Sequence, residues 1–150
     1  MEKPTTVHRV TKILVDIMFY GGIAVCIALP FVLPAVMRFF EHPPEMRIPY
    51  TIILLASGIP AVYIVYQLKQ IFKTLLGGNP FVSRNISCLR KSAVACALIA
   101  LVYLVRITFW FTVGSLVVVV IFALLCLFAL TLKDVFKQAV AYKEETDWTV

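Results

Sequence analysis

The sequence predicts an all-α integral membrane protein in which four apolar segments form a four-helix bundle. Of the 150 residues, 61% are hydrophobic and 15% are charged, whereas a soluble globular domain has about 25% charged residues. A soluble core of this size cannot bury so much apolar surface, so lipid must solvate most of it. We expect a single membrane domain over residues 1–150.

Two apolar runs in the first half of the chain predict spans at residues 13–36 and 50–69. The first run is too long for a cleaved secretory signal, whose apolar region has about 7–15 residues. A polar connection at residues 38–49 separates the two runs, and its Pro43-Pro44 pair is typical of a helix break.

The second half of the chain predicts two further spans, at residues 92–111 and 115–132. Residues 92–132 contain a single charge, Arg106. As one helix they would measure roughly 60 Å, twice the hydrocarbon thickness of ~30 Å. A turn must therefore divide them, and we expect it at residues 112–115.

Residues 70–91, between the second and third spans, are predicted to form a helical hairpin. Gly77 and Gly78 are expected to end one helix, as glycine commonly does. Asn79 is a favoured N-cap for the next helix, and Pro80 is a favoured first helical residue.

The tail at residues 133–150 ends in acidic side chains and a tryptophan. Because the hairpin is basic, opposite charges should attract, although each exposed pair contributes only about 0–1 kcal/mol. We predict that the tail docks on the hairpin with Trp148 as its anchor. The alternative is a solvated, frayed terminus, which is common for the last residues of a domain.

The distribution of Lys and Arg predicts the orientation of the protein. Eleven of the fourteen basic residues lie in the N-terminal segment, the hairpin region and the tail, and two lie in the connection at residues 38–49. Basic residues are enriched on the cytoplasmic side of membrane proteins. We therefore expect both termini and the hairpin to be cytoplasmic, in a multi-pass protein of the bacterial inner membrane. The net charge of +6 does not indicate direct nucleic-acid binding, because no soluble basic domain is present to carry it.

Two ionisable residues inside the predicted spans, Asp16 and Arg106, are candidates for function, because charges in lipid are costly. Asp16 can pair with Lys12 or Lys133, or it can be a proton or cation site in an inner cavity. Arg106 can pair with Glu41 or Glu45, or it can bind an anionic ligand. The sequence leaves these alternatives open.

Motifs for catalysis or metal binding are not found in the sequence. Cys26, Cys88, Cys96 and Cys126 form no C-x-x-C pair, and no histidine lies at ligand spacing. A nucleophile elbow and a phosphate-binding loop are missing as well. The sequence predicts no enzyme, no cofactor and no metal site, and it places Cys88 in the central loop.

Two of the expected cytoplasmic stretches resemble a known family. The hairpin contains Gly78-Asn79-Pro80-Phe81-Val82, Asn85 and Leu89-Arg90, and the tail contains Phe136-Lys137-Gln138-Ala139-Val140 and Lys143-Glu144-Glu145-Thr146-Asp147-Trp148-Thr149-Val150. Together they resemble the YoaS-like family of bacterial four-span membrane proteins (domain of unknown function 2975), in which an aliphatic residue usually stands at the position of Trp148. The resemblance implies no chemistry. Members are often encoded beside a small helix-turn-helix regulator, which implies a cytoplasmic DNA-binding partner.

The leading hypothesis is a membrane-embedded regulatory or scaffold protein that docks a cytoplasmic partner, such as a small helix-turn-helix transcriptional regulator. The residues predicted to dock this partner are Asn79, Pro80, Phe81, Asn85, Arg90, Glu144, Glu145, Asp147 and Trp148. The alternative is a small four-span transporter or ligand-binding membrane protein that uses Asp16. The lipid bilayer is the other expected partner, and a homo-oligomer stays open.

Overall fold

Four α-helices and one short 3-10 helix make up the fold in a computed structural model, which describes residues 6–79 and 81–148 apart from the side chain of Asp147. The helices are α1 (Thr6–Phe39), α2 (Arg47–Leu76), α3 (Ser83–Phe109) and α4 (Val113–Trp148), and the 3-10 helix is η1 (Pro44–Met46). The described ranges contain no strand. All four helices are long and apolar enough to cross a membrane. The prediction of an all-α fold with four membrane helices is confirmed.

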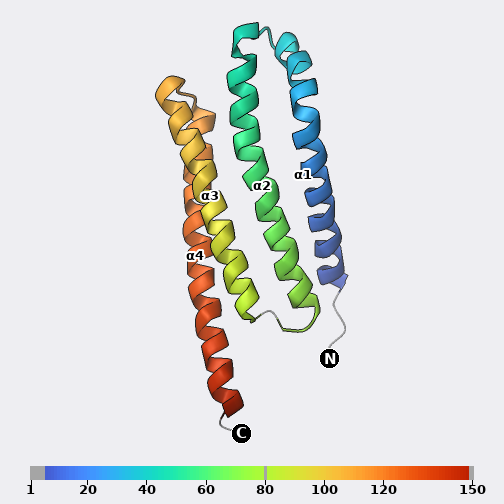
Figure 1. The fold of residues 1–150 in the computed structure, drawn as a ribbon, viewed down its shortest axis with the longest axis vertical. Coiled ribbons are helices and arrows are strands. Elements are labelled where there is room, and N and C mark those ends of the chain that lie inside the picture. The colour runs from blue at the N-terminus through green and yellow to red at the C-terminus, as the bar shows by residue number, and fades with distance from the viewer. Residues whose placement is uncertain (1–5, 80, 149–150) are drawn as a thin grey trace.

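The helices stand side by side in the order of the chain (Figure 1). Within the described residues, α1 packs on α2, α2 on α3, and α3 on α4. Both chain ends and the α2–α3 connection lie at one end of the molecule, which we call the terminal end. The α1–α2 and α3–α4 connections lie at the opposite end, which we call the loop end.

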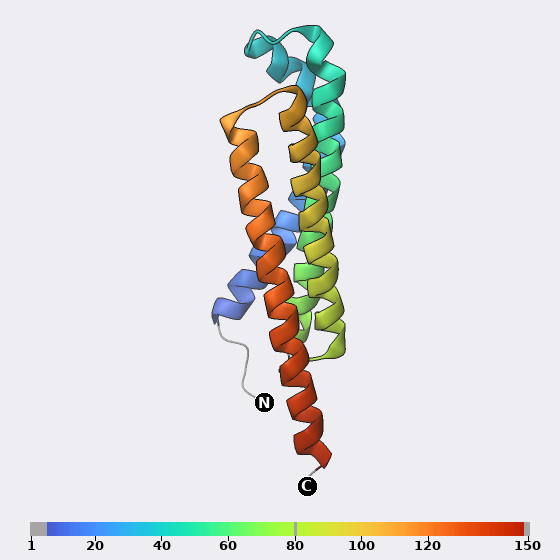
Figure 2. The same ribbon diagram turned by 90° about the vertical axis from the view of Figure 1, so that its left-hand side faces the viewer.

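Helix α4 is much longer than its apolar segment. Its 36 residues correspond to about 54 Å at 1.5 Å per residue, whereas the hydrocarbon core is ~30 Å thick. Figure 2 shows α4 running past the α2–α3 connection at the terminal end. The predicted tail is therefore a continuation of the fourth helix.

The core of the bundle follows α3, which contributes nine buried residues, compared with two each from α1 and α2. Ile99 is 1% exposed and is the largest of the fully buried side chains. Small residues such as Ala93, Cys96 and Ala100 are also buried on this helix. In lipid, helices associate through close packing rather than through the hydrophobic effect, and small residues allow that approach.

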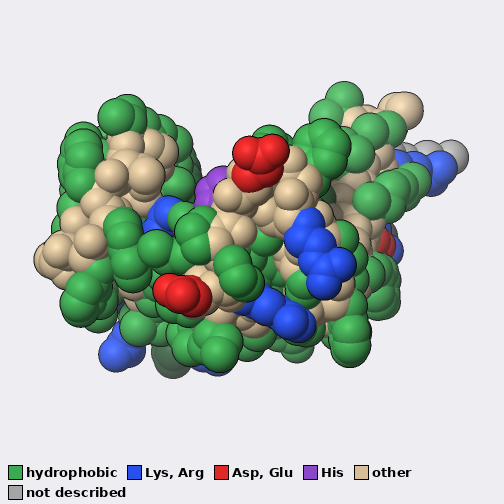
Figure 3. All heavy atoms as spheres, turned by 90° about the horizontal axis from the view of Figure 1, so that it is seen from above, with side chains coloured by type: hydrophobic (Ala, Val, Ile, Leu, Met, Phe, Trp, Pro, Cys, Tyr) green, Lys and Arg blue, Asp and Glu red, His purple; other side chains and the backbone are tan. Residues whose placement is uncertain are grey.

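Most large apolar side chains point outward instead, as expected for a surface that lipid solvates. Seen from the loop end, hydrophobic side chains line most of the rim of the molecule, and several charged side chains lie on the end face itself (Figure 3).

Helices α1 and α2 are in close contact at two glycines. A Cβ atom on Gly22 would lie 3.0 Å from Cγ2 of Val62, and one on Gly58 would lie 3.1 Å from Sγ of Cys26. Larger residues at these positions would push the helices apart. The two glycines therefore set the spacing of this helix pair.

The α2–α3 connection differs from the prediction at the start of α3. Gly78 follows α2 in the left-handed region, with a φ of 91°, as expected for a helix end. Helix α3, however, begins at Ser83, and its N-cap Val82 makes no side-chain capping bond. The side-chain oxygen of Asn79 accepts a hydrogen bond from the N–H of Phe81 at 3.3 Å, a local turn that competes with helix formation. The prediction of Asn79 as the N-cap is wrong. Pro80, which is predicted to be the first residue of the helix, lies outside the described residues.

The connection between α3 and α4 also lies earlier than predicted. It consists of residues 110–112 rather than 112–115. Ser115 already belongs to the first turn of α4, where its buried hydroxyl is hydrogen-bonded to the hydroxyl of Thr112 at 2.7 Å. This local bond lets the helix start before the glycine at position 114.

Candidate functional site

At the terminal end, two side-chain hydrogen bonds join the start of α3 to the end of α2. Asn85 is 0% exposed, and its Nδ2 donates to Oγ1 of Thr74 at 2.7 Å. At the neighbouring position, Arg84 donates to Oε1 of Gln70. These bonds hold the predicted hairpin region as a defined structure.

Helix α4 reaches this connection through an aromatic contact. The ring centres of Phe81 and Phe136 lie 5.3 Å apart with the planes at 70°, an edge-to-face arrangement that aromatic pairs favour. The predicted contact between tail and hairpin is thus made by Phe136. Trp148 is 89% exposed, so its prediction as the anchor is wrong. The reason is that α4 continues unbroken and carries Trp148 past the connection (Figure 2).

The last turns of α4 present an exposed surface formed by Glu144, Glu145 and Trp148, which we call the acidic–aromatic face. Trp148 follows the two glutamates by four and three residues, so the three side chains are neighbours on the helix. All three are exposed, and nearby Tyr142 is 74% exposed. A tryptophan beside two carboxylates is suited to bind a surface that is both basic and partly apolar.

The remaining residues predicted to dock a partner fall into different environments. Phe81 and Arg90 are exposed, and Asn79 is half-buried. Asn85 is fully buried, so it cannot contact a partner, and that part of the prediction is corrected to a structural role. Pro80 and the side chain of Asp147 lie outside the described part of the chain. Arg90 lines a cavity of about 340 Å³ with Tyr63, Ser87, Lys91 and Val94.

Asp16 is neutralised by a partner that sequence reasoning missed. Its Oδ1 lies 3.2 Å from Nζ of Lys69 on α2, so the predicted pairing with Lys12 or Lys133 is wrong. Nζ of Lys69 also lies 5.1 Å and 5.0 Å from the ring centres of Phe19 and Tyr20, within the range of cation–π attraction. Only the packing of α1 on α2 brings these groups together, and no local spacing in the sequence could have indicated it.

The ion pair borders a cavity of about 290 Å³ at the terminal end, lined by residues of α1 and α2. A salt bridge between neighbouring helices is a way to keep an aspartate and a lysine near the membrane interior without an exposed charge in lipid. The geometry therefore favours a structural role for Asp16.

Arg106 lies in the last turn of α3. Its Nη1 donates to Oγ of Ser115 at 2.7 Å, and its Cζ lies 5.4 Å from the ring centre of Tyr50 on α2. Within the described residues it forms no ion pair, so the predicted pairing with Glu41 or Glu45 is wrong. The reason is that the α3–α4 connection brings Ser115 to the guanidinium, while the packing of α2 on α3 brings Tyr50 to it.

Among the described residues, no three His, Cys, Asp or Glu side chains are grouped so that they could hold a metal ion. The four cysteines are free thiols. Cys88, predicted in the central loop, is instead buried in α3 with 5% of its surface exposed. It is out of reach of a thiol reagent in the folded protein.

Comparison with protein families matches residues 14–150 to the family described as "Protein of unknown function (DUF2975)". This finding confirms the resemblance to domain of unknown function 2975 that the hairpin and tail motifs indicated. Searches of the curated proteins and of the solved structures gave no match. The four apolar helices are those of a multi-pass membrane protein, and the chain belongs to the DUF2975 family.

Proposed function

We propose that this chain is a membrane-embedded scaffold, rather than an enzyme, which docks a cytoplasmic protein partner on the acidic–aromatic face of α4. The observation that carries the proposal is the projecting end of α4. It exposes Trp148 and Tyr142 to 89% and 74% in a segment that lies beyond the apolar span. Aromatic side chains held on a rigid helix are common anchors of protein interfaces.

The charge distribution supports a cytoplasmic position for this end. Both chain ends and the α2–α3 connection share the terminal end, and eleven of the fourteen Lys and Arg residues lie in the N-terminal segment, the tail and the helix turns that flank this connection. Basic residues favour the cytoplasmic side, where they also meet anionic lipid. The proposed location is the inner membrane of a bacterium, with the terminal end in the cytoplasm.

Charge complementarity supports a basic partner. Glu144 and Glu145 give the face a negative charge, which keeps the end of α4 away from an anionic lipid surface and attracts a basic protein. A small helix-turn-helix DNA-binding regulator has such a surface. We infer that the chain holds a regulator of this class at the membrane and makes no contact with nucleic acid itself.

A photocrosslinking experiment tests this function. A benzophenone amino acid placed at Tyr142 or at Trp148 should form adducts with one cytoplasmic DNA-binding protein, which mass spectrometry identifies. The same probe at Leu127, which is 62% exposed within the apolar part of α4, should give no such adduct. Changing Glu144 and Glu145 together to glutamine should weaken the complex about threefold to tenfold, since each exposed charge pair contributes up to about 1 kcal/mol.

Two further variants separate this function from its alternatives. Glu45→Gln removes a carboxylate at the loop end and should leave the adducts unchanged. Asp16→Asn should also leave them unchanged, because the ion pair with Lys69 is remote from the acidic–aromatic face. Adducts only with lipid or with a second copy of the chain would contradict the proposal. Loss of cellular function in Asp16→Asn with intact adducts would favour the small transporter that uses Asp16.

The proposed orientation predicts opposite thiol reactivity at the two ends of the molecule. In a variant whose four cysteines are replaced by alanine, Ser83→Cys reports on the terminal end and Gly114→Cys on the loop end. Both positions are exposed, and a Cβ atom on Gly114 would meet no atom within 4 Å. A reagent that cannot cross membranes should label Gly114→Cys in intact cells and Ser83→Cys only after lysis. The reverse pattern would place the terminal end outside the cell.

A further inference from the structure

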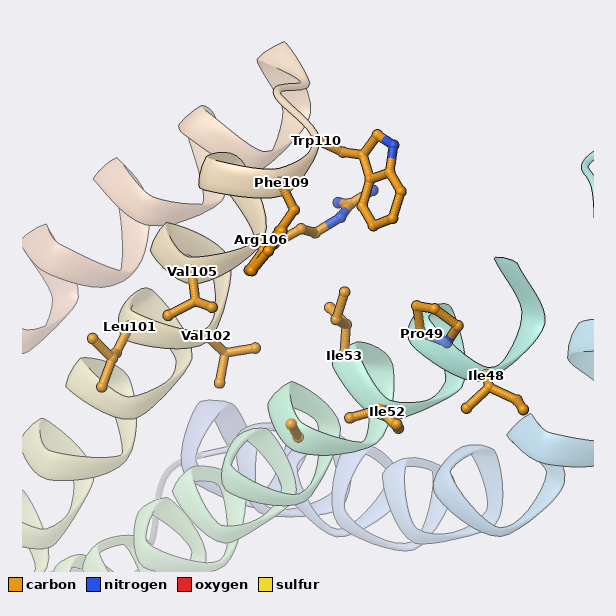
Figure 4. A pocket seen from close by; sticks show the side chains of 11 residues that line it. Ile48, Pro49, Ile52, Ile53, Leu101, Val102, Val105, Arg106, Phe109 and Trp110 are labelled. Atoms are coloured by element: carbon orange, nitrogen blue, oxygen red, sulfur yellow. The ribbon is translucent and has the colours of Figure 1, made fainter. Parts of the chain in front are cut away.

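An apolar groove lies between α2 and α3 at the loop end (Figure 4) and has a volume of about 600 Å³. Ile52 and Ile53 of α2 form one wall, and Val102 and Val105 of α3 form the other. From the loop end, a hollow is visible between the α1–α2 and α3–α4 hairpins (Figure 3). Ligand sites typically measure about 300–1,000 Å³ and are mostly apolar with a few polar groups. The groove has the dimensions and the lining of such a site.

Arg106 is the one charged residue among the eleven that line this groove. Its guanidinium and the Trp110 indole lie together at one end of it, above Ile53 (Figure 4). The guanidinium has five N–H donors, and within the described residues one of them is hydrogen-bonded, to Ser115. Its other contact is with the ring of Tyr50. Among the described residues no carboxylate forms an ion pair with it, so the guanidinium can pair with an anion from outside the chain.

The position of Arg106 indicates where that anion sits relative to the bilayer. Arg106 is in the last turn of α3, and Trp110 in the following connection is 50% exposed. Tryptophan is enriched at the boundary between lipid and water, and long basic side chains reach toward that boundary. The charged end of the groove therefore lies at headgroup level, and its apolar walls extend into the hydrocarbon.

We propose that this groove binds one phospholipid of the bilayer that has a net negative headgroup. Its phosphate contacts the Arg106 guanidinium, and one acyl chain lies between Ile52 and Val105. Arg matches the geometry of phosphate oxygens with paired N–H donors. In a headgroup that carries its own positive charge, that charge offsets the phosphate and weakens its attraction for Arg106, which is why an anionic lipid is preferred. This site is separate from the acidic–aromatic face and does not depend on the proposed docking function.

Fluorescence quenching of Trp110 by brominated lipids tests the proposal. In the Trp148→Phe background Trp110 is the single tryptophan, and the exchange is conservative because Trp148 is exposed. The full chain is reconstituted in phosphatidylcholine vesicles that contain a small mole fraction of brominated phosphatidylglycerol or brominated phosphatidylcholine. We expect about a fivefold higher affinity for the phosphatidylglycerol, because both headgroups carry the phosphate and the net negative charge that Arg106 meets is what differs between them.

Matched variants connect the preference to Arg106. Arg106→Gln should abolish the preference for phosphatidylglycerol, and Arg106→Lys should keep part of it. Arg47→Gln removes an exposed charge at the same end and should leave the preference intact. Ala56→Phe, which fills the groove, should lower quenching by both lipids. Helix content and monodispersity in detergent check that each variant folds. The proposal would be overturned if both lipids quenched Trp110 equally in the Trp148→Phe background, or if Arg106→Gln kept the preference for phosphatidylglycerol. It would also be overturned if a second copy of the chain shielded Trp110 from both lipids.

Discussion

Replacing Ile99 by alanine is expected to lower the free energy of unfolding by about 2–3 kcal/mol. Ile99 is 1% exposed, on the helix that contributes most of the buried residues. Removing three carbon atoms from such a site leaves a cavity, and Ile→Ala changes in protein cores cost about 2–5 kcal/mol. The lower part of that range applies in a membrane, because the loss there is mainly of packing contacts.

The measurement is unfolding of the purified protein in mixed micelles by sodium dodecyl sulfate, with helix content as the signal. Ile121→Ala is the matched control, since Ile121 is 48% exposed on α4 and faces outward. The same chemical change there should lower stability by much less. If both variants lost the same stability, α3 would not be the packing centre that its burial indicates.

Asn85→Ala is expected to have the second largest effect, a loss of about 1–3 kcal/mol in the free energy of unfolding. The side chain is 0% exposed and its Nδ2 hydrogen bond to Thr74 joins α3 to α2. Alanine removes this bond and leaves the hydroxyl of Thr74 with its one local acceptor, the carbonyl oxygen of Ile71 at 2.7 Å. The start of α3 should loosen in hydrogen-exchange measurements before the rest of the bundle.

Asn79→Ala provides the matched control for Asn85→Ala. Asn79 is half-buried, and its side-chain oxygen accepts a hydrogen bond from the N–H two residues later. Had Asn79 been the N-cap of α3, its loss would cost about 1 kcal/mol. Because the helix begins at Ser83 with no side-chain cap, the expected loss is a few tenths of a kcal/mol. A larger effect for Asn79→Ala than for Asn85→Ala would contradict the roles assigned to both residues.

The sequence by itself determined the membrane class, the number of helices and the family. Apolar runs of sufficient length dictate membrane helices, because backbone polar groups in lipid must bond within their own segment. Residues 13–36, 50–69 and 115–132 each lie inside one of the observed helices, and only the last two residues of the predicted third span, 92–111, lie beyond the end of α3. The two glycines after α2 correctly indicated its end, since Gly78 has a positive φ.

Only the tertiary structure decided which residues meet across helices. The sequence offered Lys12 or Lys133 to Asp16, but the packing of α1 on α2 brought Lys69 to it. It offered Glu41 or Glu45 to Arg106, but the α3–α4 connection brought Ser115. Spacing along one helix identifies neighbours three or four residues apart. The rotation and register of packed helices depend instead on small residues such as Gly22 and Gly58, where an added Cβ atom would nearly touch the partner helix. For the same reason, the lipid-sized groove beside Arg106 exists only where α2 and α3 are packed together.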